Sequence, residues 1–568
     1  MVDRLTIGVA QLATEATLER NARKITAMIP EAKAKGCRLL ITPEGALYSE
    51  GTTIAQSDAA VDQIRQAARD HDIYVLLGLH TRLKDGERMH NRLLAIGPAG
   101  DIAQSYDKLW CDKRFPHVPG PFLVDDVPCC GIICADRWHR SVEELPVWAG
   151  VKLIIECSNN YNNEWIPAWG WYWYVPRAIR NNAYVVLCNS SYDRPGPGRE
   201  SGPGHGHCAV IAPDGELLVT AAEEPDRLLV ASLDLARATR DEAVKRHSHP
   251  LFKPFWDVGG KLMGGAKMEA PSFKPLAVPE VQLTVAAAQM ACSRDIGENL
   301  TSFRRLVAEA KTGGADVVAF PELAVTGPLQ EDIRAATEAR LEGALAEVQS
   351  IARDAGLTVA FGMPGRGSGE TLCNSAFVVG PDGSLLTRYD QMVVDRADLF
   401  AAGMSSKAMW FEVKGVPAVV TLGQDALWSE IAELAATRGA SLHLHLAHDL
   451  DDSPKGRLLR KQLWVNLASY RTLTVTVNAA SPASGGSAIW QDFYRGSAGK
   501  AGGYIPHSAV ALAEAGNGEQ LLLATDKILP FNSQYDRMTQ RSNPQMAPWY
   551  IAGAQAIYDS REGWDTGG

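Results

Sequence analysis

The chain has 568 residues, of which 46% are hydrophobic and 21% charged, and this is the composition of a folded globular protein. Because a single core rarely grows beyond about 300 residues, the length predicts at least two domains. The net charge of -10, from 56 basic and 66 acidic residues, excludes a general attraction to nucleic acid or to an anionic membrane surface, so we expect a small-molecule partner.

The first predicted elements are a strand and a helix that occur twice. The apolar run Leu5–Gln11 recurs as Leu283–Gln289, and each copy is followed by an asparagine, Asn21 or Asn299, that opens a helical pattern. A repeat of this length indicates duplication of a whole structural unit.

The next predicted strand also has two copies, and both end in Pro-Glu. Leu39–Glu44 matches Val317–Glu322, which lies 278 residues further along. Both runs are apolar and short, as expected for buried strands of a sheet. The segment Asp58–Asp70 then shows a helical pattern.

Two hairpin turns with well-placed glycines follow. Gly97–Asp101 and Gly380–Ser384 precede the similar tripeptides Tyr106–Lys108 and Tyr389–Gln391, which are 283 residues apart. The slow growth of the separation indicates that the copies differ only by small changes in loops.

A further apolar strand is predicted to end at Cys134, before a helical pattern at Val142–Gly150. In the second copy Asp425 corresponds to Asp136, with a separation of 289 residues. Short strands that alternate with helical patterns and hairpins predict an α/β fold in each copy.

These matches divide the chain into three segments. We predict a first domain at 1–258, a linker at 259–280 that is rich in glycine and proline, and a second domain at 281–568.

Cys134 is the strongest candidate for a nucleophile. A thiol at the end of a strand and before a helix lies near backbone N–H groups, which lower a thiol pKa and can hold an oxyanion. A buried cysteine is more often a small core residue, so this position alone does not establish catalysis.

Two other residues strengthen the hypothesis. Glu44 ends a buried strand, where partial burial would raise the pKa of its carboxyl group and suit it to proton transfer. Lys108 could place a fixed positive charge beside an oxyanion. Taken singly, each is better explained as a solvated surface residue.

The three motifs together resemble those of the nitrilase superfamily of carbon-nitrogen hydrolases. Pro43-Glu44, Tyr106-Asp107-Lys108 and the segment Gly131–Arg137 around Cys134 occur in the order and at the separations of that family. The resemblance implies two tandem four-layer α-β-β-α sandwich domains. It also implies that Glu44 acts as base, Lys108 as oxyanion stabiliser and Cys134 as nucleophile, with the backbone N–H of Ala135 as a second oxyanion donor.

The expected reaction is hydrolysis of a C–N bond in a small amide or N-carbamoyl compound through a Cys thioester, without metal or organic cofactor. A nitrilase or an amide-forming acyltransferase would use the same chemistry on a nitrile or with an amine acceptor. The alternative from another class is a non-catalytic binding or scaffold protein.

Two departures from the family pattern affect the expected substrate preference. Many members carry a second glutamate between the lysine and the cysteine, and this segment contains none; Asp112 and His117 are the candidate substitutes. Arg180 stands where the family often has a glutamate.

The second copy lacks two of the three candidate catalytic residues. It keeps Glu322 but has Gln391 in place of lysine, and either Gly423 or Gln424 opposite Cys134, depending on whether aspartates or tryptophans are matched. We therefore expect a catalytically silent domain. It is expected to dock on the first as an intramolecular pseudo-dimer, with a further homo-oligomer as an option.

Several other features have weaker functional signals. The pairs Cys129-Cys130 and His205/His207 do not make a convincing zinc site, and the glycine-rich segment 194–206 lacks the ending of a phosphate loop. The aromatic run Trp165–Tyr174 fits a core or dimer contact, or alternatively a pocket wall.

The expected compartment is the cytoplasm. The first residues lack the basic flank and apolar stretch of a signal peptide, and no run of about 18 apolar residues predicts a membrane span. Eight of the ten cysteines lie in the first half, which in an enzyme-like chain favours reduced thiols over a disulfide scaffold.

Overall fold

The computed structural model describes residues 3–83, 88–109, 120–138, 140–160, 165–191, 204–265, 275–367, 371–492, 509–528 and 546–558. The chain forms two compact units. The first comprises Met1–Glu269 with Gly502–Pro506 and Arg541–Trp549, and the second comprises Ala270–Ala501, His507–Gln540 and Tyr550–Gly568.

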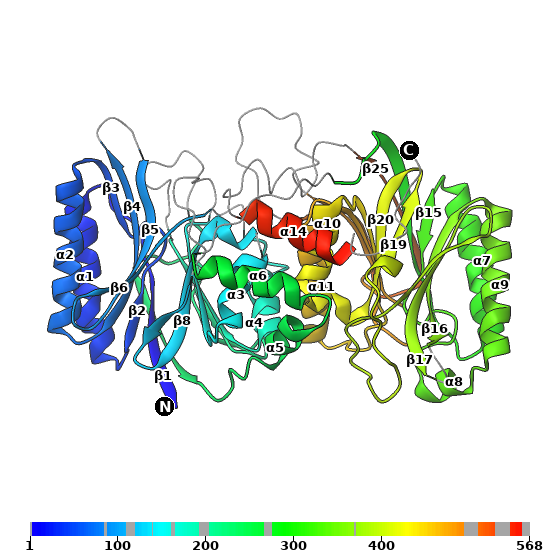
Figure 1. Ribbon diagram of the computed structural model, residues 1–568, viewed down its shortest axis with the longest axis horizontal. Coiled ribbons are helices and arrows are strands. Elements are labelled where there is room, and N and C mark those ends of the chain that lie inside the picture. Colours follow the sequence, from blue (N-terminus) through cyan, green and yellow to red (C-terminus); the bar gives the residue numbers. More distant parts are fainter. Residues whose placement is uncertain are drawn as a thin grey trace. The chain divides into compact units, whose positions relative to one another are not determined.

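The first unit contains two sheets with helices on their outer faces (Figure 1). Its strands are β1 (Arg4–Gln11), β2 (Leu39–Ile41), β3 (Leu47–Thr52), β4 (Tyr74–Leu83), β5 (Arg88–Ile96), β6 (Ile102–Asp107), β7 (Phe122–Val124), β8 (Val127–Ile133), β9 (Leu153–Ser158), β10 (Tyr184–Asn189), β11 (Ala209–Ile211), β12 (Leu217–Thr220) and β13 (Arg227–Asp234). Its helices are α1 (Leu18–Ala34), α2 (Ile54–Asp70), the 3-10 helix η1 (Cys134–Trp138), α3 (Arg140–Trp148), α4 (Val175–Asn181), α5 (Asp241–Ser248) and α6 (Lys253–Met263).

One sheet of this unit has the order β13-β1-β2-β4-β5-β6 with β3 beside β4, and the other has the order β12-β11-β10-β9-β8-β7. Helices α1 and α2 cover the first sheet, and α3 and α4 cover the second. The unit is therefore a four-layer α-β-β-α sandwich, in which strands β2 and β8 carry residues to the same region from the two facing sheets.

The second unit repeats this design. Its strands are β14 (Val281–Gln289), β15 (Val317–Ala319), β16 (Thr358–Arg366), β17 (Leu372–Val379), β18 (Leu385–Asp390), β19 (Trp410–Val413), β20 (Val416–Leu422), β21 (Leu442–Leu446), β22 (Leu473–Val477), β23 (Ala488–Asp492), β24 (Ala509–Glu514) and β25 (Gln520–Ile528). Its helices are α7 (Ile296–Thr312), α8 (Gln330–Ala335), η3 (Lys407–Met409), α9 (Glu338–Ala355), η4 (Gly423–Leu427), α10 (Ser429–Arg438) and α11 (Pro454–Ala468). Helix α14 spans Met546–Tyr558.

The strand orders in the second unit, β18-β17-β16-β15-β14-β25 and β19-β20-β21-β22-β23-β24, match those of the first. In both units the first strand pairs in parallel with the second and antiparallel with the last strand of its sheet. The predicted α/β sandwich and its duplication are therefore confirmed.

Helix starts are specified by capping residues. The Thr53 side chain accepts a hydrogen bond from the backbone N–H of Gln56, and the side-chain oxygen of Gln56 accepts one from the backbone N–H of Thr53. This capping box makes α2 start four residues before the predicted helix at Asp58. The helix predicted at Val142–Gly150 is also present, as α3.

The buried asparagines that follow the first strand of each copy have the same role. Asn21 bonds the backbone of Glu15 and the carbonyl of Tyr48, and Asn299 bonds Ser293 and the carbonyl of Val325 in the same way. These contacts tie the start of the helix to the segment after the Pro-Glu motif.

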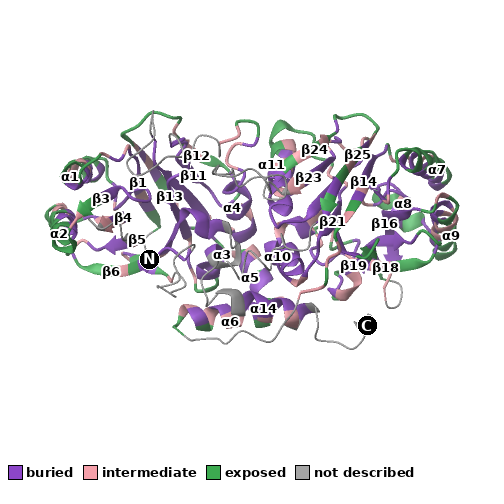
Figure 2. Cartoon of the chain, turned by 90° about the horizontal axis from the view of Figure 1, so that it is seen from above, coloured by how far each residue is buried: buried purple, intermediate pink, exposed green. Residues whose placement is uncertain are grey.

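The strands are mostly buried, and the helices expose their outer faces. Figure 2 shows buried residues along the strands and exposed residues on the outward faces of α1, α2, α7 and α9. This distribution follows from the amphipathic helices predicted by the sequence.

The predicted linker begins too early. Residues 259–263 belong to α6, which starts beside Pro254 and buries Gly259. The glycines that suggested a linker instead permit close packing: a Cβ on Gly259 would lie 2.4 Å from the ring of Trp549. Residues 266–274 of the predicted linker lie outside the described residues.

Candidate active site

The Pro-Glu segment is held by a close approach between two strands. The side chain of Thr42 accepts a hydrogen bond from the backbone N–H of Gly78 at 3.0 Å and donates one to the carbonyl of Leu76. A Cβ on Gly78 would lie 1.9 Å from the carbonyl oxygen of Pro43, so only glycine fits here. The strand β4 therefore positions Glu44 at the edge of its sheet.

Glu44 is buried and shares one oxygen between two donors. Its Oε1 accepts hydrogen bonds from Lys108 Nζ at 2.8 Å and from Asn91 Nδ2 at 2.6 Å. The side chains of Lys108 and Glu44 are 11% and 6% exposed. Such a pair persists away from water because charge and hydrogen bonding are satisfied together.

Strand pairing explains how Lys108 reaches this place. Residue Lys108 directly follows β6, and its backbone N–H donates to the carbonyl of Asn91 on β5. Burial alone would lower the pKa of Lys108, but the neighbouring Cys134 and Glu44 outweigh it and hold that pKa above its usual value. The lysine is therefore a permanent cation within electrostatic reach of the thiol.

Cys134 lies at a strained turn between β8 and η1. Its φ angle of 46° is in the left-handed region that non-glycine residues rarely adopt. The turn is braced by Asp136, whose Oδ2 accepts hydrogen bonds from the Tyr106 hydroxyl at 2.6 Å and from the Ile133 N–H at 3.3 Å. The predicted strand end at Cys134 is thus confirmed.

The thiol contacts an asparagine that the sequence did not single out. Cys134 Sγ lies 3.4 Å from Oδ1 of Asn160, which also accepts from Arg137 at 2.9 Å. The Asn160 backbone is in turn held by Asn189 Oδ1 at 2.8 Å. Asn160 therefore fixes the orientation of the side chain on which the proposed chemistry depends.

A buried network of arginines and glutamates underlies the turn. Arg137 and Arg177 both contact the Glu156 carboxylate, at 2.8 and 3.0 Å. Arg180 pairs with Glu144, so the departure at Arg180 is compensated by a buried acid. Arg180 is therefore part of the packing between α3 and α4.

Part of the aromatic run Trp165–Tyr174 is buried. Trp173, Tyr172 and Tyr174 are buried, and the Tyr174 hydroxyl donates to Glu156 at 3.0 Å. Trp165 stacks on His207 with 3.8 Å between ring centroids, while burial lowers the pKa of His205 to about 3. His205 also reaches the Asn160 carbonyl with its backbone N–H at 3.1 Å, which places this aromatic group beside the site.

The structure places Lys108 in contact with Glu44 and within electrostatic reach of Cys134, while the catalytic roles predicted for the three residues stay a prediction. Asp112 and His117, the predicted substitutes for a second glutamate, lie outside the described residues. Asn91 and Asn160 were not predicted. The signal for Asn91 was its match with Asn374 in the second copy, whereas nothing in the sequence marks Asn160.

The corresponding site of the second copy retains the glutamate and the asparagine of this arrangement. Asn374 Nδ2 donates to both Glu322 Oε1 and Gln391 Oε1, as Asn91 does to Glu44. Gly423 starts η4 with a φ of 37°, and Tyr389 donates to Asp425 at 2.8 Å. Gly423 therefore corresponds to Cys134, and the alternative match with Gln424 is wrong.

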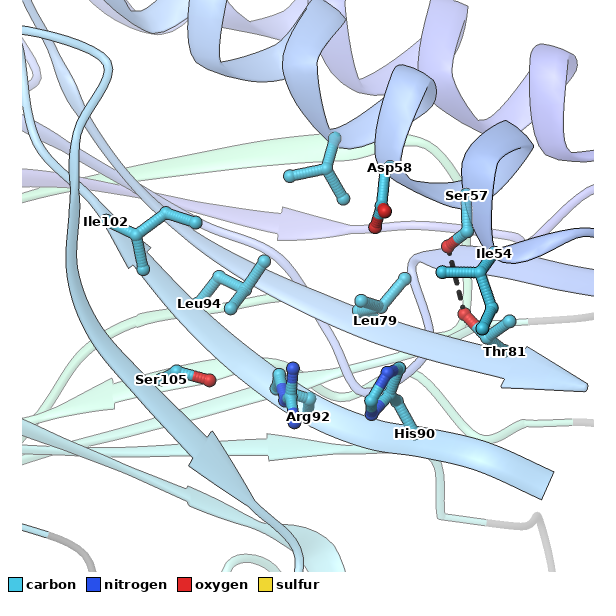
Figure 3. Close-up of a pocket in the computed structure, with 11 residues that line it drawn as sticks. Ile54, Ser57, Asp58, Leu79, Thr81, His90, Arg92, Leu94, Ile102 and Ser105 are labelled. Atoms are coloured by element: carbon cyan, nitrogen blue, oxygen red, sulfur yellow. Dashed lines mark hydrogen bonds between the residues drawn. The ribbon is translucent and has the colours of Figure 1, made fainter.

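A cavity of about 290 Å³ lies elsewhere in the first unit, between α2 and strands β4 to β6. Figure 3 shows Ser57 bonded to Thr81 at 3.1 Å near His90 and Arg92. Neighbours on a strand point to opposite faces, so Asn91, which bonds Glu44, faces away from this cavity. The cavity is separate from the site around Cys134.

Within the described ranges, no group of three or more His, Cys, Asp or Glu side chains is arranged to hold a metal ion. The described helices include none with the length and hydropathy needed to cross a membrane. The nine cysteines that the structure describes are free thiols.

The sandwich of two facing sheets occurs twice, and in the first unit it holds a buried carboxylate, amine and thiol. The family model for carbon-nitrogen hydrolases matches residues 6–242 and again 284–487. The chain therefore belongs to the carbon-nitrogen hydrolase family of enzymes, with two copies of the family domain.

Known proteins similar to this chain include amidases and a nitrilase. The omega-amidase of Homo sapiens is 23% identical over 44% of this chain and 93% of its own length. A nitrilase of Pyrococcus abyssi is 26% identical over 38% of this chain and 84% of its own length. Among solved structures, a nitrilase-superfamily amidase from Nesterenkonia covers 47% of this chain and 96% of its own, with 21% identity and a TM-score of 0.37.

Proposed function

We propose that the first unit hydrolyses the C–N bond of a small amide or N-carbamoyl compound through a thioester on Cys134. The observation that carries this proposal is the shared oxygen of Glu44, held by Lys108 and Asn91 in the site of the thiol. A buried acid, a permanent cation and a thiol are the parts that covalent amide hydrolysis needs.

In the proposed first half-reaction, the Cys134 sulfur attacks the carbonyl carbon after losing its proton to Glu44. Lys108 and the backbone N–H of Ala135 stabilise the negative charge on the carbonyl oxygen. The C–N bond then breaks as Glu44 returns the proton to the leaving nitrogen, which departs as ammonia or amine.

In the second half-reaction, Glu44 takes a proton from water, and the resulting hydroxide attacks the thioester carbon. The C–S bond breaks, the acid product leaves, and the thiol is restored with the proton from Glu44. Asn91 keeps the carboxyl group oriented through both steps, because it donates to the oxygen that Lys108 also contacts.

The similar proteins favour an amide over a nitrile substrate, because the relatives include omega-amidases. A nitrilase is the second candidate, supported by the relative from Pyrococcus abyssi. The aromatic side chains beside Asn160 favour a substrate with a flat or apolar acyl group.

The test is an ammonia-release screen over small amides, N-carbamoyl acids and nitriles, combined with intact-mass measurement. We expect an acyl adduct on the wild-type chain and none on Cys134→Ala. The matched control is Cys37→Ala, since burial raises the pKa of the Cys37 thiol to about 11 and keeps it unreactive. Turnover that survives in Cys134→Ala would reject the proposal.

Addition of amines to the same assay separates hydrolysis from acyl transfer. An amide-forming acyltransferase gives a new amide in proportion to the amine concentration, while a hydrolase gives the acid. Absence of any turnover or adduct across the screen would favour the non-catalytic binding or scaffold role.

For the second unit we propose catalytic silence and docking on the first as a pseudo-dimer. Replacement of the lysine by Gln391 and of the thiol by Gly423 supports the silence. Small-angle scattering tests the docking, because a compact chain of this length has a radius of gyration of about 24 Å. A value well above this, such as about 30 Å, would mean that the units do not dock.

A further inference from the structure

The side-chain oxygen of Asn160 joins the candidate nucleophile to a second buried cation. Cys134 Sγ donates a hydrogen bond to Asn160 Oδ1 at 3.4 Å, and Arg137 Nη1 donates to the same oxygen at 2.9 Å. All three side chains are buried. Because an amide oxygen can only accept, the proton of the first bond belongs to sulfur, and the contact is made by the thiol and not by the thiolate.

The amide of Asn160 is held in this orientation from both ends. Its Nδ2 donates to the Tyr174 hydroxyl at 3.3 Å, and that hydroxyl donates to Glu156 at 3.0 Å. A reversed amide would direct its NH2 group at the guanidinium group of Arg137 and lose both hydrogen bonds. The sulfur therefore faces an acceptor and not a donor that would stabilise a thiolate.

The second copy keeps the backbone that carries Asn160 but not its side chain. The backbone N–H of Asp449 donates to Asn478 Oδ1 at 2.9 Å, in the way that the Asn160 N–H bonds Asn189. Asp449 therefore corresponds to Asn160, and its carboxylate pairs with Arg460 at 3.0 Å. The backbone contact belongs to the fold, whereas the amide side chain occurs only in the copy that has the thiol.

The guanidinium group is also present only in the first copy. Ala426 stands at the position of Arg137, and His445 at that of Glu156, both at the separation of 289 residues that relates the two turns. The second copy therefore lacks both the cation and the amide that contact each other beside the sulfur of the first copy.

The sulfur lies among charges of both signs. The described ionisable groups around it come from both sheets and from the turn: Glu44, Lys108, Asp136, Arg137, Glu156 and Tyr174. Lys108 and Arg137 favour a thiolate, although Glu44 and Glu156 offset part of their charge. The Asn160 oxygen opposes these cations, because it accepts a hydrogen bond from the thiol and none from a thiolate.

We propose that Asn160 is a positioning residue that holds the resting Cys134 thiol in its protonated form, with Arg137 fixing the amide. The S–H bond is directed at Asn160, so the resting sulfur is a weak nucleophile. Transfer of its proton to Glu44 then requires the S–H to turn away from the amide. This inference rests on the proposed function in one respect, namely that Cys134 is the nucleophile.

Alkylation by iodoacetamide reads the thiolate directly and needs no turnover. The rate at Cys134 is measured from pH 6 to pH 10 by mass spectrometry, with fragmentation to separate this residue from its neighbour Cys130. Burial raises the pKa of Cys130 to about 12, so that thiol stays unmodified and serves as an internal reference for an intact fold. Asn160→Ala removes the acceptor and should react about 3- to 10-fold faster at pH 7, with its pH profile shifted to lower pH.

Asn160→Asp should have the opposite effect on alkylation. The carboxylate keeps the contact with Arg137 and places negative charge beside the sulfur, so the rate at pH 7 should fall by at least about tenfold. This variant changes few atoms and remains a test if Asn160→Ala does not fold. Amide hydrolysis should slow in both variants, because the thiol loses either its orientation or its acidity. The matched control is Asp449→Ala, at the equivalent position of the second unit, which should leave both rates unchanged.

Opposite shifts of the alkylation profile in the two variants are the expected result. Wild-type alkylation rates in both variants, or shifts of both profiles in the same direction, would overturn the inference. Failure of the proposed function is a separate result, since it is read as turnover that survives in Cys134→Ala.

Discussion

Replacement of Lys108 by glutamine is expected to silence the first unit without unfolding it. The second copy demonstrates that the fold accepts glutamine here, because Gln391 accepts a hydrogen bond from Asn374 at 2.8 Å. The substitution removes one stabilising charge from the proposed transition state. Loss of a single oxyanion donor lowers kcat by roughly 100- to 1000-fold.

The same variant gives a stability change whose size follows from the second copy. Without its cation, Glu44 is expected to behave as Glu322, whose pKa burial raises from 4.5 to about 8. A carboxyl pKa that is raised on folding destabilises the protein above pH 4.5, and the effect is complete near pH 8. At pH 7 it costs about 3 kcal/mol, from about 1.4 kcal/mol for each of the 2.5 pH units involved.

Hydrogen exchange in increasing urea, read by mass spectrometry on peptides of β4 and β5, reports the first unit separately from the second. Lys108→Gln should lose about 3 kcal/mol at pH 7 and much less at pH 4.5. The control is Lys33→Gln, since that lysine is 41% exposed and should change stability by less than about 0.5 kcal/mol. Lys108→Gln with near wild-type kcat, or an equal loss at both pH values, would refute the reasoning.

Three further substitutions test other parts of the first unit. Asn91→Leu removes the 2.6 Å hydrogen bond to Glu44 and should lower kcat/KM about 10- to 100-fold, whereas Asn374→Leu should leave the rate unchanged in steady-state assays. Burial alone would raise the pKa of Glu144, but Arg180 and Arg246 lower it to about 2. Glu144→Gln should therefore lower the free energy of unfolding by about 3 kcal/mol at pH 7. This difference should vanish in urea titrations as the pH falls from 4.5 toward 2, and persistence at pH 2 would contradict it. Trp549→Ala removes a ring stacked 4.6 Å from Phe255 and should cost about 3 to 5 kcal/mol, seen as faster exchange in α6; unchanged exchange there would be contrary to expectation.

The site could be predicted where it depends on local patterns. Glu44 and Cys134 each end an apolar strand, and strands of facing sheets bring such ends together. Asn160 could not be predicted, because its contact with Cys134 depends on how the segment after β9 passes the turn 26 residues away. Its side chain carries no local signal that separates it from Asn159.

The boundary of the first unit was misplaced for a similar reason. The glycines in α6 suggest a flexible linker because glycine has a low helix propensity. The sequence pattern does not show which residue packs against this helix. The partner is Trp549, whose indole N–H donates to the carbonyl of Phe255 at 2.7 Å across 294 residues. Such a contact can be recognised only after the chain has folded.

Comparison of the two copies separates residues that build the turn from residues that serve chemistry. Tyr106 and Asp136 have intact counterparts in Tyr389 and Asp425, with the same hydrogen bond, although the second turn carries glycine in place of cysteine. The brace is therefore needed for the left-handed turn itself and not for a thiol. The acid and its asparagine are retained beside a lost lysine, and burial raises the pKa of Glu322 to about 8, so this carboxyl group is mostly neutral at pH 7 and stays bonded to Asn374 without a cation.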